Sequence, residues 1–343
     1  MGVCPQSRGS SGMNFVRSTT AQSAAGRVSE PTWTQAEIVK FSCDRIERGS
    51  KSFAGAARLF RPRERESATM LYAWCRHCDD EIDGQELGFN KLSATGAATE
   101  ARLAQLREKT IAALEGQAAE PMFLALQAVV ARHAIPARYP LDLIEGMAMD
   151  VRGTKPATLE DTLLYSYHVA GCVGVMMAMI MGARQRATLK RACDLGIAFQ
   201  LTNIARDVMA DASVGRVYLP GDWLAAAGVS QEAIAEPANR GRVHAVTLRL
   251  LDEADRYYAS AYYGLADLPL RSAFAIAAAR RVYSSIGAAV RAGGAEGSLQ
   301  RARAGSARKL GALAAAGIDA LSAHAMSRFT VAPSRAGLWT MPD

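Results

Sequence analysis

Residues 199–220 of this chain read FQLTNIARDVMADASVGRVYLP, and within them Asn203, Asp207 and Asp211 recur every four positions. Residues four apart on a helix lie one turn apart on the same face, so these three form one polar stripe. The neighbouring positions are apolar, and burying a polar stripe among them is costly unless something binds it. A metal ion together with its anion is a partner of that kind.

A second acidic run, DDEID at residues 79–83, follows a helical pattern that includes Leu71. Asp79 and Asp83 lie one turn apart on the same helix face, and Asp80 lies one step around the helix. Crowded carboxylates repel one another unless a cation lies between them, and hard oxygen ligands suit Mg²⁺ or Mn²⁺. The alternative interpretation is an acidic helix end exposed to solvent.

Two such helices can face each other across an all-helical barrel and hold several divalent ions, and through them diphosphate groups. Basic residues flank both acidic runs, and we expect them to contact the phosphate oxygens that the metal ions leave free. They are Arg76, Arg206 and Arg216. Each of these arginines taken alone is also typical of a surface ion pair.

The composition favours a mostly helical protein with a sizeable core. The chain has 343 residues, of which 50% are hydrophobic, 21% are charged and 12 are prolines. Long unbroken stretches rich in Ala, Leu, Arg and Glu are typical of helices and argue against an all-β fold. Apolar periodicity predicts helices at residues 34–48, 52–60, 64–84, 98–116, 121–133, 140–151, 159–182, 186–211, 240–264, 270–292 and 299–326.

The stretch from Thr162 to Ala183 contains no Asp, Glu, Lys or Arg and is long enough to cross a bilayer. A membrane span is therefore one interpretation. The other is a central helix of an all-α core, which also explains the small residues Ala170, Gly171 and Gly174 on this stretch. Such residues let another helix or a ligand approach closely, so we favour the core helix.

The first thirty residues are rich in Ser, Gly, Thr, Ala and Gln, and they lack the apolar segment of a signal peptide or membrane anchor. We predict that residues 1–35 are a disordered extension and that residues 36–343 form one folded domain. No shift of composition after residue 35 marks a second domain.

The chain carries 40 Lys and Arg against 33 Asp and Glu, a net charge of +7, which suits an anionic partner. The basic residues are scattered and no recognition module is visible, so we expect no nucleic-acid ligand. The six cysteines predict reduced thiols in a cytosolic protein. Cys75 and Cys78 form a lone C-x-x-C pair, which helix packing explains better than zinc binding or redox chemistry.

Four segments together resemble the squalene/phytoene synthase family, and most closely its bacterial members that act in carotenoid biosynthesis. They are YAWCRHCDDEID at residues 72–83, GMAMDV at 146–151, YSYHVAGCVGVM at 165–176 and the stretch at 199–220. The similarity covers the chain from about residue 38 to its end. The last segment is the most specific because it is long.

The resemblance implies a single-domain, all-α class I isoprenoid synthase fold of the trans type with a central cavity. It implies a prenyltransferase that condenses two geranylgeranyl diphosphates head to head, through prephytoene diphosphate, to 15-cis-phytoene. That reaction is the first committed step of carotenoid biosynthesis. The carbocations that follow loss of diphosphate require a cavity that excludes water.

The resemblance further implies Mg²⁺ as the metal, with Mn²⁺ as the alternative. We find no G-x-G-x-x-G loop, Walker loop or nicotinamide-binding βαβ unit in the sequence, so we expect no role for NADPH.

The resemblance also assigns roles to individual residues. The implied metal ligands are Asp79, Asp80, Asp83, Asn203, Asp207 and Asp211. The implied catalytic residues are Asp79, Asp83, Asp207, Asp211, Arg76 and Tyr72. The residues implied to contact the substrate are Ser50, Ser52, Phe53, Tyr165, Val169, Ala170, Val173, Gly174, Gln200, Arg206, Arg216 and Tyr283.

Alternative functions stay open at this point. The nearest is a dehydrosqualene or squalene synthase that uses farnesyl diphosphate. A chain-elongating prenyltransferase or class I terpene cyclase shares paired acidic motifs but does not explain the whole segment through Pro220. A non-catalytic helical scaffold would leave the acidic helices solvated.

Because substrate and product are both very hydrophobic, we expect a cytoplasmic protein that associates peripherally with the inner face of the membrane. The basic charge balance favours the same expectation. Association with other enzymes of the carotenoid pathway is a further expectation.

Overall fold

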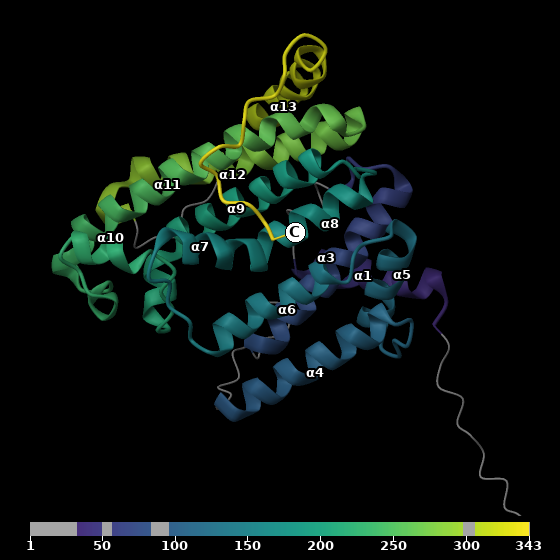
Figure 1. The fold of residues 1–343 in the computed structure, drawn as a ribbon, viewed down its shortest axis with the longest axis horizontal. Coiled ribbons are helices and arrows are strands. Elements are labelled where there is room, and N and C mark those ends of the chain that lie inside the picture. Colours follow the sequence, from purple (N-terminus) through teal and green to yellow (C-terminus); the bar gives the residue numbers. More distant parts are fainter. Residues whose placement is uncertain (1–32, 50–56, 84–95, 298–305, 343) are drawn as a thin grey trace, which may run out of the picture. The chain divides into compact units, whose positions relative to one another are not determined.

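The structure is a computed structural model that describes residues 33–49, 57–83, 96–297 and 306–342. The chain divides into two units, Met1–Trp33 and Thr34–Asp343, and the elements below belong to the second. The predicted extension at residues 1–35 lies almost entirely outside the described residues. Within the described ranges every regular element is a helix, as Figure 1 shows.

The helices are labelled as in Figure 1. The α-helices are α1 (Gln35–Gly49), α3 (Pro62–Asp83), α4 (Gly96–Leu114), α5 (Pro121–His133), α6 (Arg138–Val151), α7 (Leu159–Ser166), α8 (Cys172–Ile180), α9 (Arg186–Ser213), α10 (Gly221–Ala226), α11 (Arg240–Tyr263), α12 (Leu270–Gly297) and α13 (Ser306–Met326). A π-helix, η1 (Tyr167–Gly171), joins α7 to α8, and short 3₁₀ turns lie at Gln231–Ala233, Pro237–Asn239 and Gly264–Asp267.

Most helices predicted from the sequence are present in the structure, with ends that differ by a few residues. The helix predicted over residues 159–182 is present as one helical run, Leu159–Ile180, with a π-helical turn at Tyr167–Gly171 in its middle. The short helix α10 was not predicted. Of the helix predicted at 52–60, Ala57 is helical, residues 58–60 form a turn, and the rest lies outside the described residues.

Local sequence explains where α7 begins. Thr158 precedes the helix in an extended conformation, and its side chain accepts a hydrogen bond from the backbone N–H of Asp161. The carboxylate of Asp161 accepts in return from the backbone N–H of Thr158 at 2.9 Å. This reciprocal capping box satisfies backbone donors that the first turn leaves without partners.

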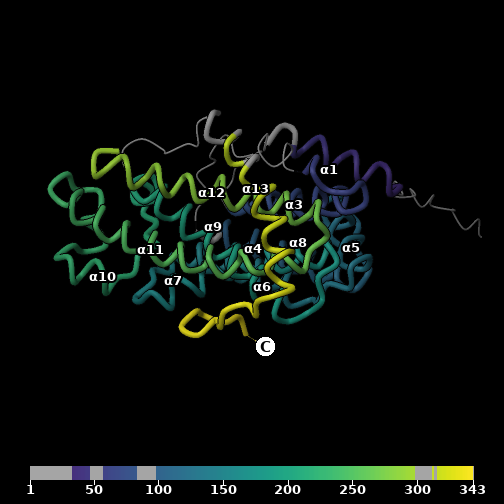
Figure 2. Tube along the Cα trace, turned by 90° about the horizontal axis from the view of Figure 1, so that it is seen from above, coloured from purple at the N-terminus to yellow at the C-terminus, as the bar shows by residue number. Residues whose placement is uncertain are grey.

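Helix α9 is the central element of this unit. It packs against α11 and α12 on one side and against α7, η1 and α8 on the other, an arrangement that can be followed in Figures 1 and 2. Helices α3, α5 and α6 in turn pack against α8. The segment from α7 to α8 therefore lies between α9 and the N-terminal helices.

Glycines let α9 approach this segment closely. A Cβ atom on Gly196 of α9 would lie 2.3 Å from the carbonyl oxygen of Ala170, and one on Gly174 of α8 would lie 2.5 Å from that of Ala192. Real Cβ atoms do not come so near to backbone atoms. The small residues Ala170 and Gly174 noted in the sequence therefore allow the backbones of two crossing helices to touch.

The apolar segment Leu159–Ile180 is long enough to cross a membrane, and 61% of its most apolar window is buried inside the structure. Burial of this kind is typical of the core helix of a soluble protein, the interpretation that the sequence favours. Cys75 and Cys78 lie on α3 without a disulfide. Cys78 is fully buried, and burial raises the pKa of the Cys75 thiol to about 12, which agrees with a packing role.

Candidate active site

The polar stripe of α9 occupies the C-terminal half of that helix. Ile204, Ala205 and Val208 are buried, whereas the stripe residues Asn203, Asp207 and Asp211 remain partly exposed. The stripe is therefore the accessible face of a helix that is otherwise packed.

Two stripe residues hold defined partners. The guanidinium of Arg206 donates to both carboxylate oxygens of Asp207, with Nε 2.9 Å from Oδ1. These side chains are 14% and 17% exposed, so the charge pair is largely shielded from water. One turn earlier, the amide of Asn203 donates to Oε1 of Gln200 at 3.3 Å.

Asp211 has an unusual electrostatic environment. Burial, together with the negative charges of Asp207 and Asp150, raises the pKa of its carboxyl to about 6, and Arg216 and Arg206 oppose the shift. A raised pKa means that the charged form of Asp211 is poorly stabilised by the protein alone. A cation bound among these carboxylates would relieve that destabilisation.

Asp150 is a site residue that sequence reasoning missed. It lies near the end of α6, and its carboxylate accepts hydrogen bonds from the hydroxyls of Tyr218, at 2.7 Å, and Tyr165, at 3.1 Å. The two tyrosine rings stack with centroids 4.6 Å apart. The GMAMDV segment at 146–151 was the signal that could have marked Asp150.

The loop after α9 turns back toward the stripe. Gly215 has a positive φ of 78°, a conformation that other residues rarely adopt, and the turn brings the backbone N–H of Arg216 within 2.9 Å of the carbonyl oxygen of Asp211. A small pocket here is lined by Asp211, Arg216 and Tyr218 together with apolar side chains. The chain therefore places a cation, a carboxylate and a phenol around one hollow.

The first acidic run lies at the C-terminal end of α3. Asp79 is 47% exposed, with one carboxylate oxygen 3.2 Å from Arg76. Asp80 is 3% exposed and lies between two guanidinium groups, 3.0 Å from Nε of Arg76 and 3.8 Å from Arg45. The side chain of Asp83 lies outside the described residues. Of the two aspartates of the first run whose side chains the structure describes, Asp79 is therefore the one open to a metal ion.

The donor set fits Mg²⁺. The carboxylates of Asp79, Asp207 and Asp211 are hard oxygen ligands, which this ion prefers. No three acidic, His or Cys side chains form a ready-made metal cluster within the described ranges. Mg²⁺ is usually held by one or two carboxylates plus water and phosphate oxygens, so an open arrangement suits binding together with a diphosphate.

The structure describes two further predicted residues, Tyr72 and Tyr283, and leaves three undescribed. Tyr72 lies half-buried on α3 one turn before Arg76. The ring of Tyr283 on α12 stacks on Phe199 of α9 with centroids 4.2 Å apart. Ser50, Ser52 and Phe53 lie outside the described residues.

The predicted cavity residues of the π-helix and α8 lie at helix crossings. Val169 faces Gly146 of α6, where an added Cβ would come within 2.8 Å of its Cγ1 atom. Ala170 and Gly174 face the backbone of α9, and Val173 is partly buried next to them in the chain. A cavity-lining role for these residues stays a prediction.

Helices α3 and α9, which carry the two acidic runs, both pack against α8. The sequence predicted that the two runs face each other, and this stays a prediction. The structure does group Asp207, Asp211, Arg206 and Arg216 at one end of α9, with Asp150 beside them.

Comparison with solved structures identifies the architecture. A crystal structure of a dehydrosqualene synthase in complex with a ligand superposes with a TM-score of 0.73 at 26% identity, covering 84% of this chain and 98% of that one. The squalene synthase HpnC of Alicyclobacillus acidocaldarius superposes with a TM-score of 0.65 at 23% identity, covering 75% of this chain and 94% of that one. The fold is thus the all-α class I isoprenoid synthase fold, as predicted.

Sequence comparisons define the family. A profile of the squalene/phytoene synthase family matches residues 46–308. A 15-cis-phytoene synthase of Paracoccus sp. is 52% identical over 89% of this chain and 98% of its own length. That of Enterobacter agglomerans is 50% identical over 87% of this chain and all of its own. The protein belongs to the squalene/phytoene synthase family, which confirms the resemblance found in the sequence.

Proposed function

We propose that the protein is a phytoene synthase, a prenyltransferase that joins two geranylgeranyl diphosphates head to head to give 15-cis-phytoene and diphosphate. The observation that carries this proposal is the identity of about half of the residues, over nearly full length, with bacterial 15-cis-phytoene synthases. A dehydrosqualene synthase shares the fold at 26% identity. The choice of C20 over C15 substrate therefore rests on sequence identity.

We propose that Mg²⁺ binds together with the substrate at Asp79, Asp207 and Asp211, with Asn203 and Asp83 as further ligands. When bound, the ion supplies charge withdrawal that lets the allylic carbon–oxygen bond of the substrate ionise. Asp80 has a different setting, because two arginines already surround its buried carboxylate.

Two arginines of the site, Arg76 and Arg216, act on the diphosphate itself. Arg216 lies beside the pocket at Asp211, and Arg76 lies beside Asp79. Guanidinium groups bind phosphate oxygens through paired hydrogen bonds and so hold the leaving group after the bond breaks. Arg206 keeps the carboxylate of Asp207 in a fixed orientation through its two hydrogen bonds.

The stacked tyrosines form an aromatic wall beside these charges. Burial strongly raises the pKa of Tyr165, and the nearby Asp150 adds to the shift. Both hydroxyls donate hydrogen bonds to the carboxylate of Asp150, so each phenol keeps its proton at cellular pH. Aromatic ring faces stabilise a carbocation by cation–π attraction, and a neutral phenol does not offer a strong nucleophile that would trap it, which supports a role for these rings in the proposed reaction.

A direct assay tests the function. Purified protein is incubated with geranylgeranyl diphosphate and Mg²⁺, without NADPH, and the extract is separated by chromatography with ultraviolet detection of a conjugated triene. A C40 triene that disappears with EDTA and returns with Mg²⁺ supports the proposal. Turnover of farnesyl diphosphate alone would show that the enzyme is instead a dehydrosqualene or squalene synthase, which uses this C15 substrate. No turnover of either substrate would refute a prenyltransferase role.

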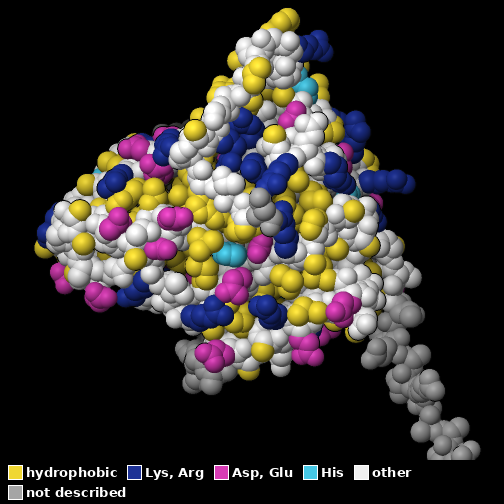
Figure 3. All heavy atoms as spheres, viewed as in Figure 1, with side chains coloured by type: hydrophobic (Ala, Val, Ile, Leu, Met, Phe, Trp, Pro, Cys, Tyr) yellow, Lys and Arg dark blue, Asp and Glu magenta, His cyan; other side chains and the backbone are white. Residues whose placement is uncertain are grey.

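We further propose that the protein is cytoplasmic and docks on the inner face of the membrane. Large apolar side chains are exposed on α13 and the segment after it, where Ile318 is 67%, Leu321 61%, Phe329 87% and Val331 96% exposed. Figure 3 shows hydrophobic side chains at this end of the molecule, with Lys and Arg nearby. Apolar groups beside basic ones suit an anionic lipid surface.

Flotation with vesicles that contain phosphatidylglycerol tests the docking. The unaltered protein is expected to float with the vesicles, and a double variant Leu321→Ser and Phe329→Ser is expected to stay in the soluble fraction. Equal recovery of both proteins with the vesicles would contradict this docking surface. Association with other carotenoid-pathway enzymes stays a prediction.

A further inference from the structure

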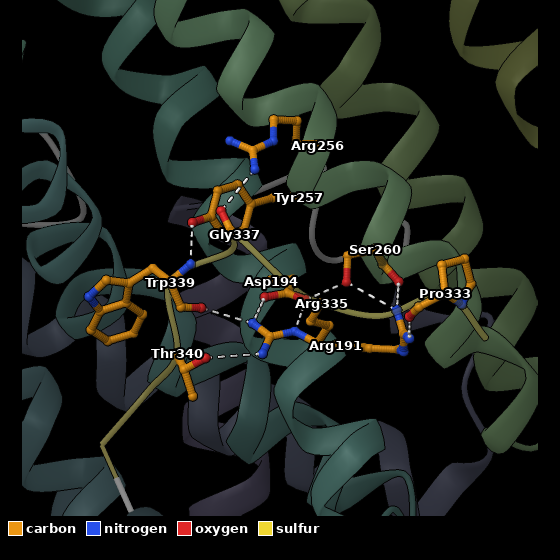
Figure 4. A network of polar contacts seen from close by, with 10 residues as sticks. All are labelled: Arg191, Asp194, Arg256, Tyr257, Ser260, Pro333, Arg335, Gly337, Trp339 and Thr340. Carbon is orange, nitrogen blue, oxygen red and sulfur yellow. Dashed lines mark hydrogen bonds and ion pairs between the residues drawn. The ribbon is translucent and has the colours of Figure 1, made fainter.

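The segment after α13 is anchored to the body of the protein by a dense set of contacts. We call residues 327–342 the C-terminal strap. They contain turns but no helix. Figure 4 shows the part of the strap from Pro333 to Thr340 beside labelled residues of α11 and α9. None of the site residues predicted from the sequence belongs to this strap.

The strongest anchor is an ion pair in the interior. The guanidinium of Arg335 donates from Nε to Oδ2 of Asp194, at 2.7 Å, and from Nη2 to Oδ1, at 2.5 Å. Asp194 lies on α9 with no exposed surface, and Arg335 is 13% exposed. Ser260 of α11 donates a further hydrogen bond to Asp194. A buried carboxylate of this kind depends on its directly bonded partner, because removing the guanidinium would leave its charge poorly compensated.

The second anchor lies on the π-helix. The ring of Trp339 contacts the ring of Tyr167 at a centroid distance of 5.2 Å, and its backbone N–H donates to the hydroxyl of Tyr257 at 3.0 Å. Tyr167 is 1% exposed, and its hydroxyl donates a hydrogen bond to the carboxylate of Asp142 on α6. Trp339 therefore covers the first residue of the π-helix and completes its packing.

These two anchors lie on the two helices that meet at one crossing. Asp194 is two residues from Gly196, which meets the backbone of Ala170 in the π-helix. Contact of this type has few interdigitating side chains to keep the two helices in register. The strap holds one helix through Arg335 and the other through Trp339, so it acts as a cross-link over the crossing.

We propose that Arg335 and Trp339 are positioning residues for the reaction, an inference that rests on the proposed function. Farther along α9 lie Asp207 and Asp211, and two residues before Tyr167 lies Tyr165, which holds Asp150. A shift at the crossing would change the separation between the acidic stripe and the aromatic wall. Displacements of about 1 Å in an active site lower turnover strongly.

The test compares four variants of the full-length protein. Trp339→Ala removes the ring, Trp339→Phe restores an aromatic contact, and Arg335→Lys keeps the charge while losing the paired hydrogen bonds. The matched control is Arg256→Ala, which breaks a strap contact to the carbonyl oxygen of Gly337 on the exposed side of α11. Each variant is assayed for kcat, KM, melting temperature and the ratio of released prephytoene diphosphate to phytoene.

At a temperature well below melting, Trp339→Ala and Arg335→Lys are expected to lower kcat about tenfold with KM changed less than twofold, and to release more intermediate. Trp339→Phe and Arg256→Ala are expected to keep the kcat, KM and product ratio of the unaltered protein. Lowered melting temperatures with unchanged kcat and product ratio would overturn the proposal, because a purely stabilising strap gives that result.

Amide hydrogen exchange separates failure of this inference from failure of the proposed function. In Trp339→Ala, faster exchange is expected in residues 165–171 and 190–196 as well as in the strap, whatever substrate the enzyme uses. Faster exchange confined to residues 327–342 would overturn the positioning role.

Discussion

The ring of Tyr165 stacks on the ring of Tyr218 with 16° between their planes, and both hydroxyls donate to the carboxylate of Asp150. The tyrosines come from α7 and from the loop after α9, and the carboxylate comes from α6. One acidic side chain thus ties three parts of the chain together beside the stripe of α9.

We therefore expect Asp150→Asn to lower kcat by about 10- to 100-fold while the protein stays folded. The amide retains a single oxygen acceptor where the carboxylate has two, so one tyrosine loses its orientation. The control is Asp252→Asn on α11, an exposed residue that pairs with Arg291. Steady-state kinetics on geranylgeranyl diphosphate provide the measurement, and equal kcat in both variants would contradict a role for Asp150.

Removing a carboxylate of the α9 stripe should have a larger effect. Asp207→Asn and Asp211→Asn are each expected to reduce kcat by about 10³-fold, because each removes charge that would hold a cation at the diphosphate. A titration of activity against Mg²⁺ should show a higher metal requirement for both. If activity and metal requirement are unchanged, the stripe is a structural surface and the metal binds elsewhere.

The two neighbouring aspartates of α3 should behave differently from each other. Asp79 is half exposed, whereas Asp80 is buried between Arg76 and Arg45. We expect Asp79→Asn to raise the Mg²⁺ concentration needed for half-maximal activity. We expect Asp80→Asn to lower the free energy of unfolding by about 3 kcal/mol, because Arg45 and Arg76 each lose a buried, charged partner.

Urea unfolding and Mg²⁺ titration of both variants check this pair of predictions. An Asp80→Asn variant of normal stability with a raised Mg²⁺ requirement would instead support the ligand role that family resemblance implied for Asp80.

The sequence was sufficient to predict the helical class, most helix positions and the stripe of α9, because these depend on residue spacing within a single helix. Asp150 was missed because its role depends on Tyr165 and Tyr218, which the fold brings to it from other segments. Family resemblance also added Asp80 to Asp79 as a further metal ligand, although the two side chains differ greatly in exposure. Burial of that kind depends on neighbouring helices, which local periodicity does not describe.

The crossing of α9 with the π-helix leads to the last prediction. Gly196→Ala places a methyl group 2.3 Å from the carbonyl oxygen of Ala170, so one helix must move. We expect the free energy of unfolding to fall by about 3 kcal/mol, the upper range for overpacking. Gly241→Ala, on the exposed start of α11 with no atom within 4 Å of the added methyl, is the matched control.

The control variant should be neutral or more stable by up to about 1 kcal/mol, because alanine favours the helix over glycine. Urea unfolding followed by circular dichroism measures both variants. Gly196→Ala should also lower kcat, since the displaced helix carries Asp207 and Asp211 toward or away from Tyr165. If Gly196→Ala is as stable as Gly241→Ala, the two backbones are not in contact, and the strap then has no crossing to hold.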